Sequence, residues 1–256
     1  MYGNGTFARR LRLRRLYRQD SAGLLVVPLD HAIGSGPLDG LLAVLADCDV
    51  DAVVLHKGAL RRVRPDRFRA MSFLLHLNAS TSLAADPDAK YPVATVEEAL
   101  RLGAGGVSMH VNVGSATEDR QIAHLAATAE QCDRWGLPLL AMMFVRGPAV
   151  VDQRDPATVA HALAVATELG ADLVKTALPD DPGSIARITA ACPVPVLAAG
   201  GDAGDGAATI GRLATAVRAG AGGVAAGRVV FTAGEPSTVA SRLAGLVHGR
   251  TAVVAR

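Results

Sequence analysis

Short apolar runs recur along the chain, and each is followed by a polar or Gly-rich break and then a longer segment rich in Ala and Leu. The runs are apolar at consecutive positions, which is typical of strands buried on both faces of a parallel sheet. Eight such runs that alternate with helical segments predict an α/β fold, the closed (β/α)8 TIM barrel. The predicted strands are residues 24–29, 52–55, 73–77, 106–111, 138–143, 172–174, 195–199 and 222–226.

The length of 256 residues and the hydrophobic content of 50% suit a single barrel domain over residues 1–256, with residues 1–22 as an N-terminal helical extension. A short repeat supports this division, because LGAGGV, LGADLV and AGAGGV each combine a helix end, a Gly cap and the start of a strand. The longest irregular segment, 80–92, follows the third strand. We expect it to be an active-site loop.

The formal net charge of +2 favours neither nucleic acid nor a membrane surface as a partner. Arginines concentrate in residues 9–18, which predicts a short basic helix that docks on the barrel through Leu11, Leu16 and Tyr17. The sequence has no signal peptide and no apolar run that could span a bilayer, so we expect a cytoplasmic protein. Its three cysteines are far apart, which favours reduced thiols over disulfides or a zinc site.

Lysine is rare in this chain, because only Lys57, Lys90 and Lys175 stand among 26 basic residues. A lysine that persists in an arginine-rich background points to chemistry that arginine cannot perform. Only the lysine amine loses its proton readily enough to act as a nucleophile.

Polar residues, glycines and one phenylalanine stand at the ends of the predicted strands where a barrel of this kind builds its active site. In strand order they are Asp30, His31, His56, Lys57, Asn78, His110, Asn112, Phe144, Arg146, Lys175, Gly200, Gly201, Gly227 and Arg228. We expect these residues to converge on one rim of the barrel.

Lys175 is the best candidate for a nucleophile, because it follows the apolar residues Leu173 and Val174 directly. An apolar wall disfavours the ammonium form and lowers the pKa of a lysine. The alternative is a structural ion pair with a neighbouring carboxylate. Lys57 ends the second strand, where it serves catalysis as a second cation or forms a salt bridge on the rim.

Asp30, His31 and His110 are the candidates for the proton transfers that imine chemistry needs. For His56 and His76 we favour satisfied core residues. A zinc site from His31, His76 and His110 is a further alternative, but no HxH or HxxxH spacing supports it, and no metal ligand is assigned.

Gly-rich turns follow the last two predicted strands, in segments 198–204 and 225–231. Backbone N–H groups in such turns can close on a phosphate, and barrels commonly bind phosphate at these two positions. Arg228 is available there as a counter-charge.

Several motifs make the chain resemble the archaeal-type class I aldolases, the group of DeoC and fructose-bisphosphate aldolases. They are VPLDHAIGSGPLDGL (27–41), HLNASTSLAADPDAK (76–90), TVEEAL (95–100), VSMHVNVGS (107–115), WGLPLLAMMFVRGP (135–148), LGADLVKT (169–176) and VPVLAAGG (194–201). The resemblance implies that Lys175 forms an imine, that Asp30 assists proton transfer, and that Gly200-Gly201 and Gly227-Arg228 hold a phosphate. It also implies aspartate semialdehyde as the acceptor aldehyde.

The sequence departs from this family at one position. Relatives carry a tyrosine as general acid/base in the MMYPRGP block, and here that position is Phe144. A phenyl ring cannot donate a proton, so His31, His110 or a water held by Asp30 must act instead.

The resulting hypothesis is a Schiff-base aldolase without a cofactor that condenses dihydroxyacetone phosphate with L-aspartate 4-semialdehyde for aminohydroxybenzoate-type secondary metabolism. Enzymatic alternatives are a transaldolase that uses a 6-deoxy-5-ketofructose phosphate donor toward dehydroquinate, and a fructose 1,6-bisphosphate aldolase. A barrel that binds a sugar phosphate without catalysis is the alternative from another class. We expect small phosphorylated ketones and aldehydes as partners, and a homo-oligomer.

Overall fold

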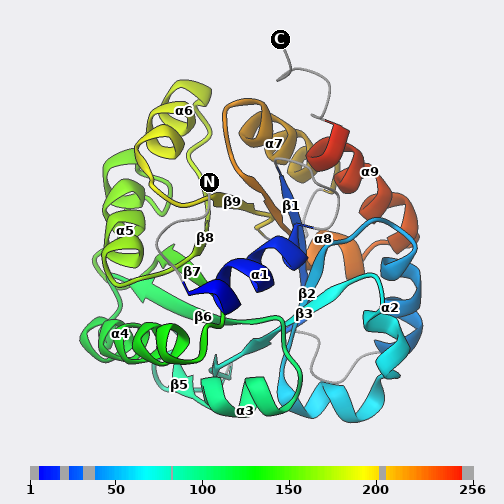
Figure 1. The fold of residues 1–256 in the computed structure, drawn as a ribbon. Coiled ribbons are helices and arrows are strands. Elements are labelled where there is room, and N and C mark those ends of the chain that lie inside the picture. The colour runs from blue at the N-terminus through cyan, green and yellow to red at the C-terminus, as the bar shows by residue number, and fades with distance from the viewer. Residues whose placement is uncertain (1–5, 18–22, 31–37, 82, 202–205, 250–256) are drawn as a thin grey trace.

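The computed structural model describes residues 6–17, 23–30, 38–81, 83–201 and 206–249. Eight parallel strands close into a barrel in the order β1-β10-β9-β8-β7-β6-β3-β2, which confirms the predicted fold (Figure 1). They are β1 (Leu24–Pro28), β2 (Ala52–Leu55), β3 (Ser72–His76), β6 (Gly106–Val113), β7 (Leu139–Val145), β8 (Leu173–Thr176), β9 (Val196–Ala199) and β10 (Gly223–Ala225).

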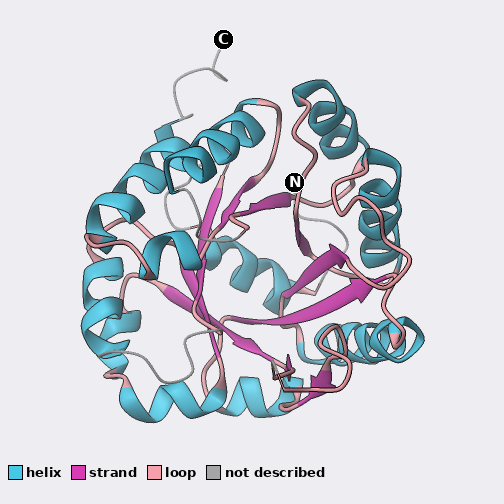
Figure 2. Ribbon diagram, turned by 180° about the vertical axis from the view of Figure 1, so that it is seen from behind, coloured by secondary structure: helices cyan, strands magenta, loops and turns pink. Residues whose placement is uncertain are grey.

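Helices surround the barrel and cover its outer face (Figure 2). They are α2 (Leu38–Ala46), α3 (Val96–Arg101), α4 (Glu118–Trp135), α5 (Pro156–Glu168), α6 (Pro182–Ala191), α7 (Gly206–Arg218), α8 (Arg228–Phe231) and α9 (Pro236–His248), with the 3-10 helices η1 (Lys57–Arg62) and η2 (Pro65–Phe68). Local sequence starts several of them. At α5 and α6 an Asp side chain accepts the free backbone N–H groups and a Pro occupies the first turn.

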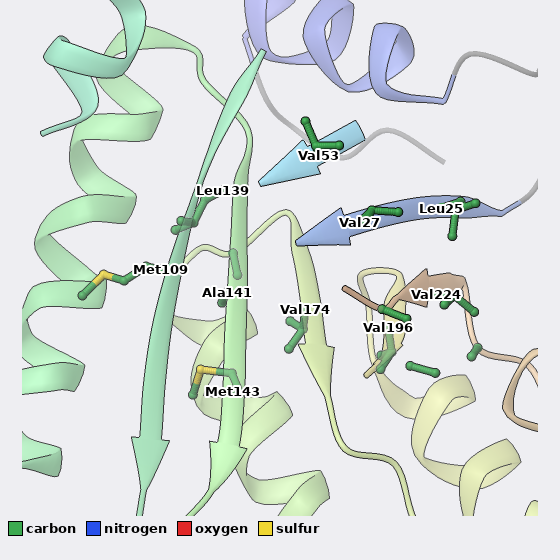
Figure 3. Packing of buried hydrophobic residues seen from close by; sticks show 14 of the residues in the cluster. Leu25, Val27, Val53, Met109, Leu139, Ala141, Met143, Val174, Val196 and Val224 are labelled. Carbon is green, nitrogen blue, oxygen red and sulfur yellow. The ribbon is translucent and has the colours of Figure 1, made fainter. Parts of the chain in front are cut away.

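Seven of the eight barrel strands contribute to two apolar layers, whereas the interior face of β6 carries the polar residues Ser108, His110 and Asn112. One face packs against the helices through residues such as Val27, Met109 and Val174 (Figure 3). The other face fills the barrel interior through residues such as Leu140 and Leu173. In the seven strands with two apolar faces, the sequence shows no alternation although the side chains alternate in space.

The interior face changes from apolar to polar toward the carboxyl ends of the strands. Lys175 follows Leu173 by two residues in β8, and His76 follows Leu74 by two residues in β3. Side chains two residues apart in a strand share a face. The apolar interior therefore forms the floor on which the polar residues of the site stand.

Helix α1 (Phe7–Leu16) closes the opposite end of the barrel and lies across its centre in Figure 1. Leu16 is fully buried in the interior cluster, and Leu13 and Tyr17 pack against that cluster. Arg9 forms an ion pair with Asp172 at 3.6 Å. The prediction that α1 docks on the barrel is confirmed for Leu16 and Tyr17 but was wrong for Leu11, which is 37% exposed.

The segment after β3 folds against the carboxyl end of the barrel. The short strands β4 (Asn78–Ala79) and β5 (Tyr91–Pro92) pair antiparallel and bracket the predicted loop. In the part of the chain that the structure describes, no helix is long and apolar enough to cross a membrane.

The floor of the barrel generates a stability prediction. Leu16→Ala should lower the free energy of unfolding by about 2–5 kcal/mol, because it leaves a cavity under the interior cluster. Leu11→Ala on the same helix should change it by less than about 0.5 kcal/mol, because surface substitutions rarely cost more. Urea unfolding of both variants measures the difference. Equal effects would contradict the role given to α1.

Candidate active site

The amine of Lys175 is buried at the carboxyl end of the barrel. Lys175 pairs in register with Met142 of β7 and with Leu197 of β9, and 9% of its surface is exposed. The pKa of the Lys175 amine is lowered from 10.5 to about 8, mainly by burial; the charge of Asp30 opposes this lowering, and the charges of Arg228 and Arg146 add to it. About a tenth of the Lys175 amine is therefore neutral and nucleophilic at pH 7, far more than of a lysine with the ordinary pKa of 10.5.

Lys175 opens into a cavity of about 150 Å³. The lining includes most of the residues predicted from the sequence: His110, Phe144, Arg146, Lys175, Gly200, Gly201, Gly227 and Arg228. It also includes Gln153, Arg154 and Phe231, which the sequence did not single out. The structure thus brings together residues from β6, β7 and β8 with the turns after β9 and β10.

Phe144 lies at the centre of this group. Its ring centroid is 5.8 Å from the Lys175 Nζ, 5.4 Å from the Arg146 guanidinium carbon and 4.9 Å from the His110 ring centroid. The position at which the family resemblance implies a tyrosine therefore lies next to Lys175. Its ring offers a π-face to two cations and has no proton to donate.

Asp30 follows β1 and is buried beside the cavity. Its Oδ2 lies 3.8 Å from the Nε2 of His76, whose Nδ1 is 2.8 Å from the Ser108 hydroxyl. His76 is therefore a satisfied buried residue, as predicted, and it also backs a carboxylate that acts on Lys175. The predicted residue His31 lies outside the residues that the structure describes.

His110 is held by a network of amides. The Asn78 side-chain nitrogen donates to the His110 carbonyl, and the Asn78 Oδ1 accepts from the His110 backbone N–H. The Nε2 of His110 lies 2.8 Å from the Oδ1 of Asn112. Burial lowers the pKa of His110 well below its ordinary value, and the charge of Lys90 adds to this effect. The Asn112 amide nitrogen donates to the Asp88 carbonyl, so its oxygen accepts from His110. Neutral His110 then carries its proton on Nε2 and a lone pair on Nδ1.

Two Gly positions bring bare backbone into the cavity. A side chain at Gly227 would place its Cβ 1.9 Å from the Pro28 carbonyl oxygen, so the turn after β10 packs directly on the end of β1. Gly201 has φ of +70°, which favours glycine. Part of the predicted segment 198–204 lies beyond the described residues, which stop at Gly201 before α7.

Lys57 does not join the cavity. It lies at the start of η1, its side chain is 46% exposed, and its Nζ forms an ion pair with Glu98 at 3.1 Å. This geometry matches the rim salt bridge rather than a catalytic cation. Among the residues that the structure describes, no three His, Cys, Asp or Glu side chains gather in a way that could hold a metal.

Two of the residues missed by sequence reasoning, Gln153 and Arg154, come from a loop, and the third, Phe231, ends helix α8. Arg154 precedes α5, pairs with Asp180 after β8, and approaches the turn at Gly201. Arginine-rich composition hides such a residue. Only the position of Arg154 in the loop after β7, the fifth barrel strand along the chain, could have indicated it.

Comparisons with known proteins show which proteins this chain is similar to. A family model described as DeoC/LacD family aldolase matches residues 25–233. The chain is 52% identical over 255 residues to the 2-amino-4,5-dihydroxy-6-oxo-7-(phosphonooxy)heptanoate synthase of Streptomyces griseus, covering 97% of this chain and 93% of that protein. It is 41% identical over 243 residues to the 2-amino-3,7-dideoxy-D-threo-hept-6-ulosonate synthase of Halobacterium salinarum, covering 93% and 90%.

A solved structure supplies the chemical parallel. It is an archaeal fructose-1,6-bisphosphate aldolase with its catalytic Lys covalently bound to the carbinolamine intermediate of the substrate. The match has a TM-score of 0.82 and 28% sequence identity, and it covers 94% of this chain and 100% of that chain.

The electrostatics of Lys175 predict a pH profile. Below its pKa of about 8 the amine is protonated and unreactive, and above that pH it is neutral, so labelling by an amine reagent should rise with a midpoint near pH 8. Asp30→Asn should move the midpoint to lower pH, because the Asp30 charge stabilises the ammonium form.

Peptide mass mapping of Lys175 labelling across pH measures both midpoints. Glu97→Gln removes an exposed carboxylate from α3 and should leave the midpoint in place. An upward shift in Asp30→Asn would contradict the assigned electrostatics.

Proposed function

We propose that this chain, which belongs to the DeoC/LacD aldolase family, condenses dihydroxyacetone phosphate with L-aspartate 4-semialdehyde. The product is a seven-carbon amino keto acid phosphate, 2-amino-4,5-dihydroxy-6-oxo-7-(phosphonooxy)heptanoate. As a class I aldolase, the enzyme uses a lysine that forms a Schiff base. The observation that carries the proposal is the buried, partly neutral Lys175, which faces a cavity between two Gly-rich turns.

The chemistry begins when the neutral Lys175 amine adds to the C2 carbonyl of the donor ketone. The carbinolamine loses water to give an iminium, whose positive charge acidifies the C3–H bond. A base removes the C3 proton, and the C3 carbon of the resulting enamine adds to the aldehyde carbon of the acceptor. The new alkoxide takes a proton, and water then releases the product and the free amine.

The donor phosphate is assigned to the turns after β9 and β10. Gly200, Gly201 and Gly227 bring backbone close to the cavity, and Arg228 supplies a positive charge. Arg228 also lowers the pKa of Lys175, so the same cation favours both phosphate binding and the neutral amine. A dianionic phosphate bound there would weaken this repulsion only after the donor has arrived.

We assign the removal of the C3 proton to His110, which acts as the base. Its Nδ1 carries a lone pair in the tautomer set by Asn112, and its ring lies 4.9 Å from Phe144 within the cavity. Asp30 is assigned the proton transfers at the carbinolamine, because its charge acts on the Lys175 amine. His31 stays a predicted alternative to His110.

Two enzymatic rivals share this machinery and differ in the donor or acceptor. A transaldolase would take a 6-deoxy-5-ketofructose phosphate as donor, and a fructose 1,6-bisphosphate aldolase would need a site for a second phosphate. The 52% identity to the Streptomyces griseus synthase supports the first proposal over both. A binding protein without catalysis would have no reason to hold a buried amine beside two arginines.

The proposal also covers the cellular compartment and the oligomeric state of the enzyme. Cys48, Cys132 and Cys192 are free thiols, which supports the proposal of a cytoplasmic enzyme. The homo-oligomer stays a prediction.

Substrate pairing tests the proposed function. Purified protein mixed with dihydroxyacetone phosphate and L-aspartate 4-semialdehyde should form a product of the summed mass, seen by mass spectrometry. Replacement of dihydroxyacetone phosphate by 6-deoxy-5-ketofructose phosphate should give little product, and fructose 1,6-bisphosphate should be cleaved slowly. Lys175→Met removes the amine and should abolish the product. Product from the deoxyketose donor alone would assign the chain to the transaldolase reaction.

A further inference from the structure

The third lysine of the chain, Lys90, has no part in the chemistry described above, yet it lies next to the site. Its Nζ donates to the Ser80 hydroxyl at 2.6 Å, across the base of the loop between β4 and β5. Two residues earlier, the Asp88 carbonyl accepts from the side chains of Asn112 and Gln121. Because Asn112 also bonds His110, this loop is fastened to the strand that lines the cavity.

Lys90 and Arg146 are two cations whose charges act on each other, although only Arg146 lines the cavity. Arg146 follows β7, lines the cavity, and has a buried Nε without a hydrogen-bond partner among the residues that the structure describes. Its guanidinium lies over the Phe144 ring. Partial burial lowers the pKa of Lys90, and the charge of Arg146 lowers it further, so the two cations repel each other. An anion between them would relieve that repulsion.

The orientation of the donor ketone in the cavity determines from which side the acceptor aldehyde approaches. The proposed phosphate site lies after β9 and β10, and Lys175 stands on β8. In a three-carbon ketone phosphate, C3 points away from the phosphate on C1, with the imine carbon between them. C3 therefore faces β7 and β6, which carry Phe144 and His110, and the acceptor aldehyde must approach from there.

We propose that Lys90 and Arg146 form a carboxylate subsite that selects the acceptor aldehyde, an assignment that rests on the proposed function. The acceptor carbon bonds to C3, and the acceptor carboxylate lies toward Lys90 at the base of the loop. Arg146 offers planar donors above Phe144, and Lys90 offers a point charge. With Arg228 at the phosphate, the site then has cationic side chains for both anionic ends of the product.

This arrangement gives Phe144 a role besides the loss of the tyrosine hydroxyl. The centroid of the Phe144 ring lies 5.4 Å from the guanidinium carbon of Arg146 and 5.8 Å from the Nζ of Lys175, so the ring packs against both cations. An apolar ring has no hydroxyl to compete for the guanidinium donors. Arg146 therefore keeps them for the acceptor.

Selectivity between matched aldehydes tests the subsite. With dihydroxyacetone phosphate as donor, the wild-type enzyme should prefer succinic semialdehyde, which has a carboxylate, over butanal, which has the same carbon count and no charge. Lys90→Gln should lower this ratio of kcat/KM values by about 10- to 100-fold, the effect of one lost charge-assisted contact. Lys90→Arg keeps the charge and should restore most of the preference.

Two controls separate a contact with substrate from a structural role. Ser80→Ala removes only the hydroxyl that Lys90 bonds, and Arg101→Gln removes an exposed cation from α3. Both variants should retain the wild-type ratio. A loss in Ser80→Ala equal to that in Lys90→Gln would overturn the proposal, and so would an equal loss for both aldehydes in Lys90→Gln.

The outcome also separates this subsite from the proposed function. If L-aspartate 4-semialdehyde is not used while succinic semialdehyde is still preferred through Lys90, the proposed function fails and the carboxylate subsite stands. If Lys90→Gln impairs glyceraldehyde 3-phosphate as acceptor but neither carboxylated aldehyde, the subsite binds phosphate and the proposal is overturned.

Discussion

Burial of the Lys175 amine is the constraint on which the site depends. The barrel interior beneath it is apolar, so the charged form of the amine loses solvation, and its pKa falls to about 8. Arg146 and Arg228 contribute to this lowering of the pKa, and the charge of Asp30 opposes it. Helix α1 seals the far end of the barrel with Leu16 and keeps water from the floor. The stability of the fold and the reactivity of the lysine thus depend on the same apolar layer.

Much of the rim could be predicted from sequence, because the residues involved directly follow strand runs. Lys175 and Asp30 needed only the rule that barrels build their sites at the carboxyl ends of strands. The ends of β6 and β7 were predicted two residues early. Asn112 looked like the end of a strand, but its backbone N–H donates to Gln121 and its side chain to Asp88, so a polar residue continues the strand.

Other parts of the site had no local signal. The loop that carries Lys90 is held beside the site because Asn112 bonds Asp88 across 24 residues of sequence, a contact that no strand or helix pattern encodes. Arg154 is positioned by Asp180 from a different loop. Lys57 carried the strand-end signal but turns to Glu98 on the surface, because a 3-10 helix begins there and the side chain stays in solvent. The positions of loop residues depend on contacts between segments that are far apart in the sequence. Those segments come together only when the barrel has closed.

Borohydride trapping tests the central claim most directly, that Lys175 is the residue that forms the imine. The protein is incubated with dihydroxyacetone phosphate and reduced, and its intact mass and peptides are measured. The account predicts one reduced donor per chain, located on the peptide that contains Leu173, Val174 and Lys175, and no such adduct in Lys175→Met. An adduct on Lys57 or Lys90, or turnover without any trapped adduct, would contradict it.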